Sequence, residues 1–175
     1  MEDKEHTYTG IQLRGADMIA IIAAIDRRHG IGYRGQLLFH IKEDMKRFRD
    51  LTMGNAILMG RRTYDSLPHG ALPGRRNMVV SRTTRSIPGC EVYGSITDAI
   101  TAYRKVQSAE DLYIIGGEEI YRQTISLADR LYLTEINATA PHADAFFPEY
   151  NDFTCKEEEA HDGYRFRMYE KMNNK

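Results

Sequence analysis

The sequence contains no tryptophan and only two cysteines, Cys90 and Cys155, among its 175 residues. Because no secretion signal accompanies them, two thiols argue against a disulfide framework and indicate a reducing, cytoplasmic environment. The longest apolar run, residues 18–25, spans eight residues, whereas a helix that crosses a bilayer needs about 20. The six histidines do not recur at the spacings of metal ligands. We therefore expect neither a membrane span nor a bound metal ion.

The composition is not that of a disordered chain either. Hydrophobic residues make up 42% of the sequence and the formal net charge is −1, so the chain can bury a core within one domain. Residues 1–17 are polar and lack the apolar segment of a signal peptide. We expect them to form a flexible extension and residues 18–175 to form the domain.

Positive charge is concentrated in one part of the chain. Residues 47–85 contain eight arginines and two aspartates, although the whole chain is slightly acidic. Because the guanidinium group binds phosphate and carboxylate bidentately, this pattern favours a small polyanionic ligand. Nucleic acid is the alternative, but the arginines occur in pairs at the ends of predicted elements and not along a continuous basic helix.

Short apolar runs alternate with helical segments, which indicates strands linked by helices. Strands are predicted at residues 18–25, 55–59, 77–81, 112–115, 131–136, 153–160 and 164–169. Helices are predicted at residues 41–53, from Ser95 to about residue 106, and from Gly117 to about residue 127, with a short helix after Gly60 and a long loop at residues 26–36.

His161-Asp162-Gly163 is a hairpin turn signal between the last two strands. The sequence therefore predicts an α/β fold: a single domain with a mostly parallel, mixed central sheet flanked by helices, and a C-terminal antiparallel hairpin.

The helix predicted at residues 41–53 places one acidic side chain among apolar ones. At 100° per residue, Met45, Phe48 and Leu51 form an apolar arc with Ile41, and Asp44 is the only charged residue inside it. Asp44 either favours the helix dipole from the first turn or faces an apolar pocket, and the pattern supports both interpretations equally. In a pocket it would bind a ligand with paired N–H donors, and burial would raise its pKa into a range useful for proton transfer.

Arginines follow two of the predicted strands, in Gly60-Arg61-Arg62-Thr63 and in Ser81-Arg82. Cations at the start of a helix oppose its dipole, so a bound phosphate would explain them, whereas exposure to solvent is the plainer alternative. Arg75 either lies in solvent or reaches over a pocket rim to a carboxylate.

Gly116-Gly117 precedes a predicted helix and offers backbone amides to a diphosphate. Glu118 and Glu119 follow directly, and they would repel a diphosphate, so contact there would be made through the backbone.

These motifs, in this order and spacing, resemble the dihydrofolate reductase family from Met18 to the C-terminus. The matching segments are Ile-Ala-Ile-Ile-Ala-Ala-Ile at 19–25, Gly30-Ile31-Gly32, the helix with Asp44 and Phe48, Met59-Gly-Arg-Arg-Thr63, Leu72-Pro-Gly-Arg75, Val80-Ser-Arg82, Ile115-Gly-Gly-Glu-Glu-Ile-Tyr121, Leu131-Tyr-Leu-Thr134, and Asp144 with Phe147-Pro148. The resemblance implies hydride transfer from NADPH to 7,8-dihydrofolate, giving tetrahydrofolate for one-carbon metabolism. It also implies a monomer that binds antifolate inhibitors, and neither nucleic acid nor a membrane.

The resemblance further implies roles for individual residues. Asp44 is expected to bind the pterin and promote its protonation, with Thr134 bonded to both and Tyr121 near the reacting centre. The other substrate-binding residues that it implies are Ile22, Ala23, Met45, Phe48, Leu72, Ile115 and, on the glutamate carboxylate, Arg75. The cofactor-binding residues that it implies are Ala24, Ile31, Gly32, Leu37, Gly60, Arg61, Arg62, Thr63, Ser81, Arg82, Ile115, Gly116, Gly117, Glu118, Glu119, Ile120 and Tyr121. Residues 32–37 are expected to form a mobile loop that closes over the site.

The sequence departs from the family pattern in three ways. It has no tryptophan, so a smaller ring without an N–H donor replaces the indole that commonly lines this wall of the site. Leu38-Phe39 stands where members usually have Pro-Trp, and Gly116-Gly117-Glu118 lacks the third consecutive glycine of some members. These departures bear on loop closure, cofactor affinity and antifolate sensitivity. Two rival hypotheses remain: another reductase on the same scaffold, such as the pyrimidine reductase of riboflavin synthesis, which should not need an acid at position 44, and a non-catalytic module that binds nucleotides or nucleic acid through the basic segment.

Overall fold

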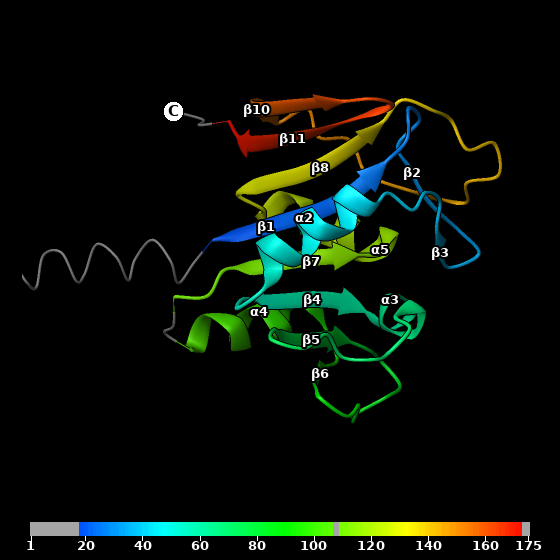
Figure 1. Ribbon diagram of the computed structural model, residues 1–175. Coiled ribbons are helices and arrows are strands. Elements are labelled where there is room, and N and C mark those ends of the chain that lie inside the picture. Colours follow the sequence, from blue (N-terminus) through cyan, green and yellow to red (C-terminus); the bar gives the residue numbers. More distant parts are fainter. Residues whose placement is uncertain (1–17, 107–108, 173–175) are drawn as a thin grey trace, which may run out of the picture.

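An eight-stranded sheet runs through the computed structural model, which describes residues 18–106 and 109–172 (Figure 1). The expectation for residues 1–17 lies outside this part of the chain. The strand order is β10-β11-β8-β1-β7-β4-β5-β6. The strands are β1 (Ile19–Ile25), β4 (Ala56–Gly60), β5 (Arg76–Val80), β6 (Cys90–Tyr93), β7 (Leu112–Gly116), β8 (Arg130–Ile136), β10 (Phe153–His161) and β11 (Tyr164–Lys171).

Strand directions confirm the mixed sheet that the sequence predicts. Every pairing from β8 to β6 is parallel, and only β11 runs antiparallel to its neighbours β8 and β10. His161 pairs with Tyr164 at the end of β10 and β11, so Asp162 and Gly163 form the expected two-residue turn.

Helices cover both faces of the sheet, as Figure 1 shows. Helix α2 (Lys42–Thr52) lies on one face, which we call the α2 face, and α4 (Ile96–Lys105) and α5 (Glu118–Thr124) lie on the other, the α4–α5 face. Side chains alternate along β1 because successive strand residues point to opposite faces. Ile21 packs into the core of the α4–α5 face, whereas Ile22 packs into the core of the α2 face with Phe48 and Leu51.

The helix predicted from Ser95 is confirmed at its start. Ser95 caps α4, because its hydroxyl oxygen accepts a hydrogen bond from the backbone N–H of Asp98 at 3.0 Å. The helix after Gly117 is shorter than predicted, since α5 ends at Thr124 and a 3₁₀ turn, η1 (Ile125–Leu127), follows. The short helix after Gly60 is α3 (Arg61–Ser66).

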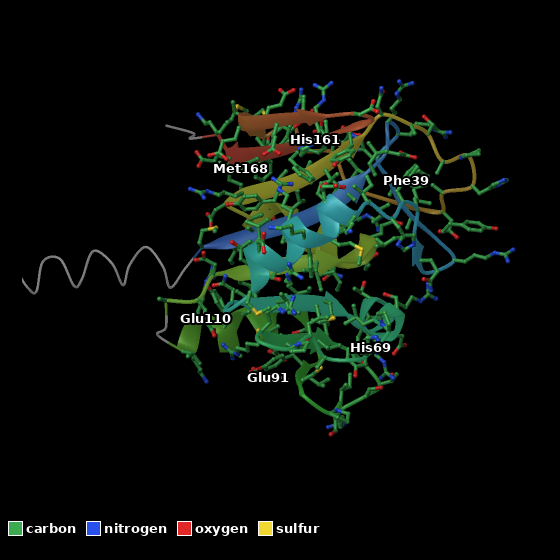
Figure 2. All side chains as sticks on the ribbon, viewed as in Figure 1. Phe39, His69, Glu91, Glu110, His161 and Met168 are labelled. Atoms are coloured by element: carbon green, nitrogen blue, oxygen red, sulfur yellow. The ribbon has the colours of Figure 1, made fainter. Side chains whose placement is uncertain are left out.

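The prediction of a long loop at residues 26–36 is wrong. Strands β2 (Gly30–Tyr33) and β3 (Gln36–Leu37) form a hairpin there, and β2 also pairs with β9 (Ala145–Phe146) in a separate small sheet. A Cβ on Gly30 would lie 2.9 Å from the Ala143 side chain, so this pairing needs a glycine. The partner strand lies far along the sequence, and local composition therefore could not reveal the pairing. Phe39 follows the hairpin, on the way to α2 (Figure 2).

Candidate active site

Asp44 lies in the first turn of α2 and points toward the sheet. The Thr134 hydroxyl on β8 donates a hydrogen bond to its Oδ1. Thr134 faces α2 because Tyr132, two residues before it, packs in the core of the α2 face, and alternate strand residues share a face. Of the two interpretations that the sequence leaves open, the structure supports the inward-facing carboxylate.

The surroundings of Asp44 change its acidity. Burial raises the pKa of its carboxyl group above the ordinary value, while the Thr134 hydrogen bond and the charge of Arg47 act in the opposite direction. Its Oδ2 has no hydrogen-bond partner among residues 18–106 and 109–172. The carboxylate therefore keeps one oxygen available for a ligand, in surroundings that favour its protonated form.

Two expectations for α2 are wrong. Met45 is 60% exposed, although its position on the helix predicts the buried side. Asp44 is also not the only charged residue on the inner side, since Arg47 is partly buried and donates a hydrogen bond to the Leu133 carbonyl oxygen at 3.2 Å. A 100° projection could not place Arg47, because a long side chain can bend back over neighbouring strands.

Most of the other residues expected around the pterin share the α2 face. Ile22 packs in its core, and Phe48, Leu72 and Ile115 pack against that core. Ala24 pairs with Thr134 in the sheet register, which brings it beside the acid. Ala23 is the exception, because its side chain belongs to the core of the α4–α5 face and only its backbone can face a ligand near Asp44.

Tyr121 lies beneath this part of the sheet. Its side chain is buried, and its hydroxyl donates a hydrogen bond to the Ile22 carbonyl oxygen at 2.7 Å. Burial raises the pKa of Tyr121, and the nearby charge of Asp44 raises it further. Tyr121 therefore stays protonated and fixes the backbone of β1 next to the acid. Ile31 also packs on the α4–α5 side and not beside Asp44.

Arg75 lies beyond the other end of α2, on the loop before β5. Its Nη1 donates to Thr52 Oγ1 at 3.2 Å, and its Nε donates to the Pro73 carbonyl oxygen at 2.9 Å. Burial lowers the pKa of the Arg75 guanidinium, and the charge of Arg49 lowers it further. Two arginines in reach of one another form a site that attracts an anion.

A second group of cations lies where β4 and β5 end. These strands are parallel neighbours, so the segments that follow them meet at one edge, where Arg61 donates a hydrogen bond to the Thr84 hydroxyl oxygen. Ser81 Oγ accepts from the Thr84 backbone N–H at 3.1 Å and shapes this turn. Arg62 and Arg82 are exposed and have no ion-pair or hydrogen-bond partner in the described part of the chain.

Gly116 and Gly117 lie beside the start of α3. Gly116 has a φ of +129°, and a Cβ there would lie 3.3 Å from the Tyr121 hydroxyl oxygen and 3.4 Å from Thr63 Oγ1. A Cβ on Gly60, at the end of β4, would lie 3.1 Å from the Ile120 side chain. Glycines at these positions let the ends of β4 and β7 approach closely and leave backbone groups accessible.

Glu118 and Glu119 follow the two glycines and pair with Arg122 on the same helix. Glu119 lies 2.9 Å from the Arg122 guanidinium, and Glu118 pairs with its other nitrogen. Glu118 also accepts a hydrogen bond from the Phe146 backbone at 3.1 Å. These contacts offset their negative charge beside the glycines, and they tie α5 to the small sheet that carries Gly32 and Leu37.

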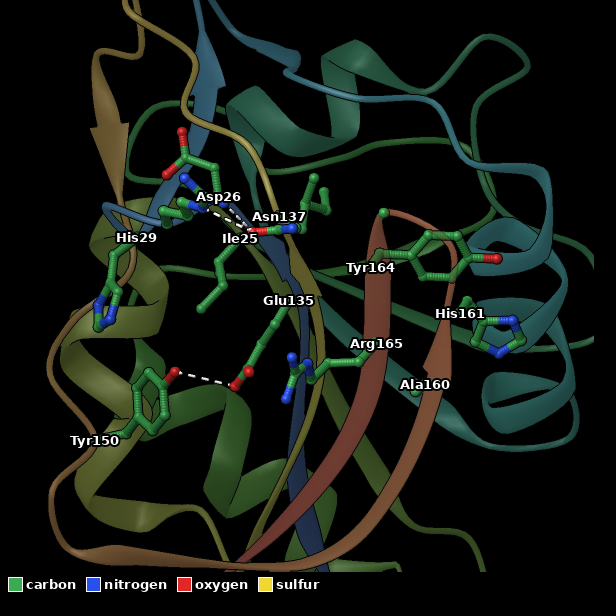
Figure 3. Close-up of a pocket in the computed structure, with 13 residues that line it drawn as sticks. Ile25, Asp26, His29, Glu135, Asn137, Tyr150, Ala160, His161, Tyr164 and Arg165 are labelled. Atoms are coloured by element: carbon green, nitrogen blue, oxygen red, sulfur yellow. Dashed lines mark hydrogen bonds between the residues drawn. The ribbon is translucent and has the colours of Figure 1, made fainter.

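A separate cavity of about 280 Å³ lies away from this group (Figure 3). Glu135 lines it and follows Thr134 directly, so its side chain faces the other side of the sheet. Tyr150 and Glu135 point toward one another in Figure 3, and the Tyr150 hydroxyl donates to the carboxylate at 3.2 Å. None of the residues expected at the site lines this cavity.

Comparisons with known proteins agree on one family. A family model described as "Dihydrofolate reductase" matches residues 18–171. A dihydrofolate reductase of Mycobacterium leprae (strain TN) is 40% identical over 130 residues, which cover 73% of this chain and 77% of the relative. One of Bacillus subtilis (strain 168) is 34% identical over 166 residues, which cover 89% of this chain and 96% of the relative.

A solved structure shares the fold. It is titled as dihydrofolate reductase from Enterococcus faecalis complexed with NADP(H) and RAB-propyl, and it matches with a TM-score of 0.81 at 26% identity, covering 90% of this chain and 98% of that chain. None of the helices in the described residues is both long and apolar enough to cross a membrane.

Proposed function

The chain belongs to the dihydrofolate reductase family, and we propose that it reduces 7,8-dihydrofolate to tetrahydrofolate with NADPH, using Asp44 to bind the pterin and promote its protonation. The observation that carries the role of Asp44 is its inward carboxylate, with Oδ1 held by Thr134 and Oδ2 without a partner among the described residues. A flat ring with two adjacent N–H donors matches such a carboxylate.

Asp44 performs two tasks in this proposal. As a carboxylate it accepts the N–H donors of the pterin, while Thr134 keeps it oriented through the hydrogen bond to Oδ1. Because burial raises its pKa, Asp44 holds a proton at higher pH than an exposed aspartate does, and it is proposed to promote protonation of the ring nitrogen N5.

The walls of the site orient the substrate and exclude water. Ile22, Phe48 and Leu72 offer apolar surface on the α2 face, and the exposed Met45 is proposed to lie at the rim. Arg75 is proposed to bind the glutamate carboxylate, supported by its anchoring to Thr52 and Pro73 and by the second charge of Arg49. A dry cleft favours hydride transfer because it prevents side reactions and strengthens the interactions of Asp44.

The residues at the ends of β4, β5 and β7 fit a dinucleotide phosphate. Bound NADPH would supply the hydride. Arg62 and Arg82, which lack partners among the described residues, are proposed to bind its phosphates together with Arg61, Thr63 and Ser81. The backbone at Gly116 and Gly117 is proposed to face the diphosphate. Residues proposed to lie near the nicotinamide are Ala24, Ile31, Ile115 and Tyr121, and those proposed along the rest of the cofactor are Gly32, Leu37, Gly60, Glu118, Glu119 and Ile120.

The direct test of the proposed function is a turnover assay on the folded protein. We expect loss of the reduced-nicotinamide absorbance when both dihydrofolate and NADPH are present, much slower loss with NADH, and inhibition by an antifolate. Absence of turnover with authentic substrate would reject the proposal. Reduction of a pyrimidine substrate without antifolate inhibition would instead support the riboflavin-type reductase.

The proposal includes a monomer in the cytoplasm, formed by residues 18–175 with residues 1–17 as an extension. The free thiols of Cys90 and Cys155 support the location, since a reducing compartment keeps thiols free. Light scattering coupled to gel filtration tests the oligomeric state, because the measured mass of a dimer would be twice the chain mass of 20.1 kDa.

A further inference from the structure

Arg47 is a second charged residue on the inner side of α2, one turn after Asp44. Its guanidinium carbon lies 4.6 Å from the centroid of the Phe166 ring and 5.6 Å from that of Tyr132. Its Nη1 donates to the Leu133 carbonyl oxygen at 3.2 Å. These three contacts come from β8 and β11, so two strands hold the cation in one place over the sheet.

This placement brings Arg47 close to the acid without joining the two in an ion pair. Phe166 pairs directly with Thr134 across β11 and β8, and Thr134 holds Asp44. No hydrogen bond or ion pair links Arg47 to Asp44 in the described residues, and Asp44 Oδ2 remains without a partner there. A direct ion pair would occupy that oxygen, whereas a cation held beyond ion-pair distance on the same helix favours the ionised carboxylate and leaves its oxygen available.

We propose that Arg47 is a positioning residue, which sets the protonation state of Asp44 through space without touching the substrate. The inference rests on the proposed function, since it concerns how that reaction depends on pH. The opposing effects on Asp44 support it: burial raises the pKa of the carboxyl group, whereas Thr134 and Arg47 lower it. Arg47 is the only cation among these influences.

Two phenols on neighbouring elements also interact with the charge of Asp44. The charge of Asp44 raises the pKa of Tyr121 on α5 and of Tyr164 on β11, in addition to burial. Glu43 also raises the pKa of Tyr164, whose hydroxyl donates a hydrogen bond to the Glu43 carboxylate at 3.4 Å. They are phenols with raised pKa values, so they stay neutral near pH 7 and add no charge beside the acid.

The groups that face Arg47 are acidic or phenolic. Burial lowers the pKa of its guanidinium, and the charges of Asp44, Tyr132, Glu159 and Glu157 oppose this. Glu159 and Glu157 lie on β10, opposite Phe166 and Met168 of β11. They help to keep Arg47 charged, and they weaken its effect on Asp44 without reversing it.

The test is a direct titration of Asp44 in the protein without ligands, by carbon-detected NMR of protein whose aspartate carboxyl groups are labelled with carbon-13. The spectrum of Asp44→Asn identifies the signal. We expect Arg47→Gln to move the midpoint of Asp44 to higher pH by about half a unit to two units, the range that Coulomb's law gives for unit charges about 6 Å apart at dielectric constants of about 80 and about 20. Arg47→Lys should keep the midpoint near that of the parent protein.

A matched control removes another cation from the same helix. Lys46 is exposed and pairs with Asp50 at 2.7 Å, so Lys46→Gln lowers the net charge equally but should move the midpoint much less. An unchanged midpoint in Arg47→Gln, or equal shifts in Arg47→Gln and Lys46→Gln, would overturn the inference. If Arg47→Gln does not fold, Arg47→Met replaces it, because methionine fills the same space over the rings without charge.

A kinetic readout separates the inference from the proposed function. In single-turnover hydride transfer, the pH midpoint of Arg47→Gln should move upward with the titration midpoint, while Arg47→Lys restores the parent profile. A parent protein without turnover would reject the proposed function, yet the titration would still decide the electrostatic role of Arg47. A parent protein that turns over, with the same pH profile in Arg47→Gln, would reject the inference alone.

Discussion

Thr134 on β8 donates its hydroxyl hydrogen to the carboxylate of Asp44 on α2, although the two residues are 90 positions apart in the sequence. Thr134 is 1% exposed, so this hydrogen bond is shielded from water. A shielded bond to a charged group is stronger than one at the surface. The contact fixes the acid at the point where the helix meets the sheet.

Asp44→Asn should lower the rate of hydride transfer about 100-fold or more near neutral pH, which is the contribution typical of acid–base groups. The amide cannot supply a proton, so the rate should recover in part as the pH falls and solvent protonates the substrate. Single-turnover kinetics with NADPH and dihydrofolate measures this. Asp50→Asn, an exposed change on the same helix, serves as the control, and equal pH profiles for both variants would refute the role of Asp44.

The same Asp44→Asn variant should be more stable than the parent protein at neutral pH. The pKa of Asp44 is raised in the folded protein above its ordinary value of 3.8, so the ionised carboxylate opposes folding at any pH above the folded pKa. We expect the melting temperature to rise, because the amide carries no charge for burial to penalise. The difference should vanish as the pH falls through the raised pKa toward 3.8, and calorimetry at pH 7 and pH 3.5 would detect it.

Thr134→Val should move the pH dependence in a defined direction. The Thr134 hydrogen bond lowers the pKa of Asp44, so its loss should raise that pKa and shift the midpoint of the rate profile to higher pH. Valine has nearly the same shape, and the substitution therefore tests the hydrogen bond and not the packing. Thr97→Val, an exposed change on α4, provides the comparison, and a downward shift in Thr134→Val would contradict this account.

The helix and the sheet that carry this site are predictable from the sequence, whereas its second charge is not. Apolar runs and capping signals give β1, β7, β8 and α4 because these depend on nearby residues. The position of Arg47 depends on Tyr132 and Phe166, and strand β2 depends on β9. Local periodicity does not reveal such long-range contacts. Strand β6 was not predicted for the same reason, since its pairing with β5 holds it in the sheet.

Candidate residues follow the same division. Family motifs identify Asp44, Thr134 and the arginines after β4 and β5. In the structure Thr134 bonds to Asp44, and the segments that carry the arginines meet at one edge of the sheet. Motifs do not show which way a side chain points, so Ala23 was expected beside the ligand although its side chain faces the α4–α5 face. Met45 was expected in the apolar, buried arc of α2 and is 60% exposed, because a helical projection gives the direction of a side chain and not whether another element covers it.

Replacing Arg61 and Arg82 together by alanine should abolish the preference for NADPH over NADH. Only the 2′-phosphate distinguishes the two cofactors, and losing a charge-assisted contact to a phosphate costs about 1.5–3 kcal/mol. KM for NADPH should therefore rise at least tenfold, with KM for NADH nearly unchanged. The double variant Arg104→Ala/Lys105→Ala, on the exposed end of α4, controls for net charge. Equal use of both cofactors by the parent protein would contradict the phosphate assignment.

The central claim is that Asp44 supplies the acid function of an NADPH-dependent dihydrofolate reductase, and the pH profile of hydride transfer in the parent protein tests it most directly. A single turnover with NADPH and dihydrofolate should become faster as the pH falls, with a midpoint that matches the NMR titration of Asp44 in the non-reacting complex with NADP⁺ and dihydrofolate. A rate independent of pH between 5 and 9, or a midpoint unrelated to that titration, would contradict the claim.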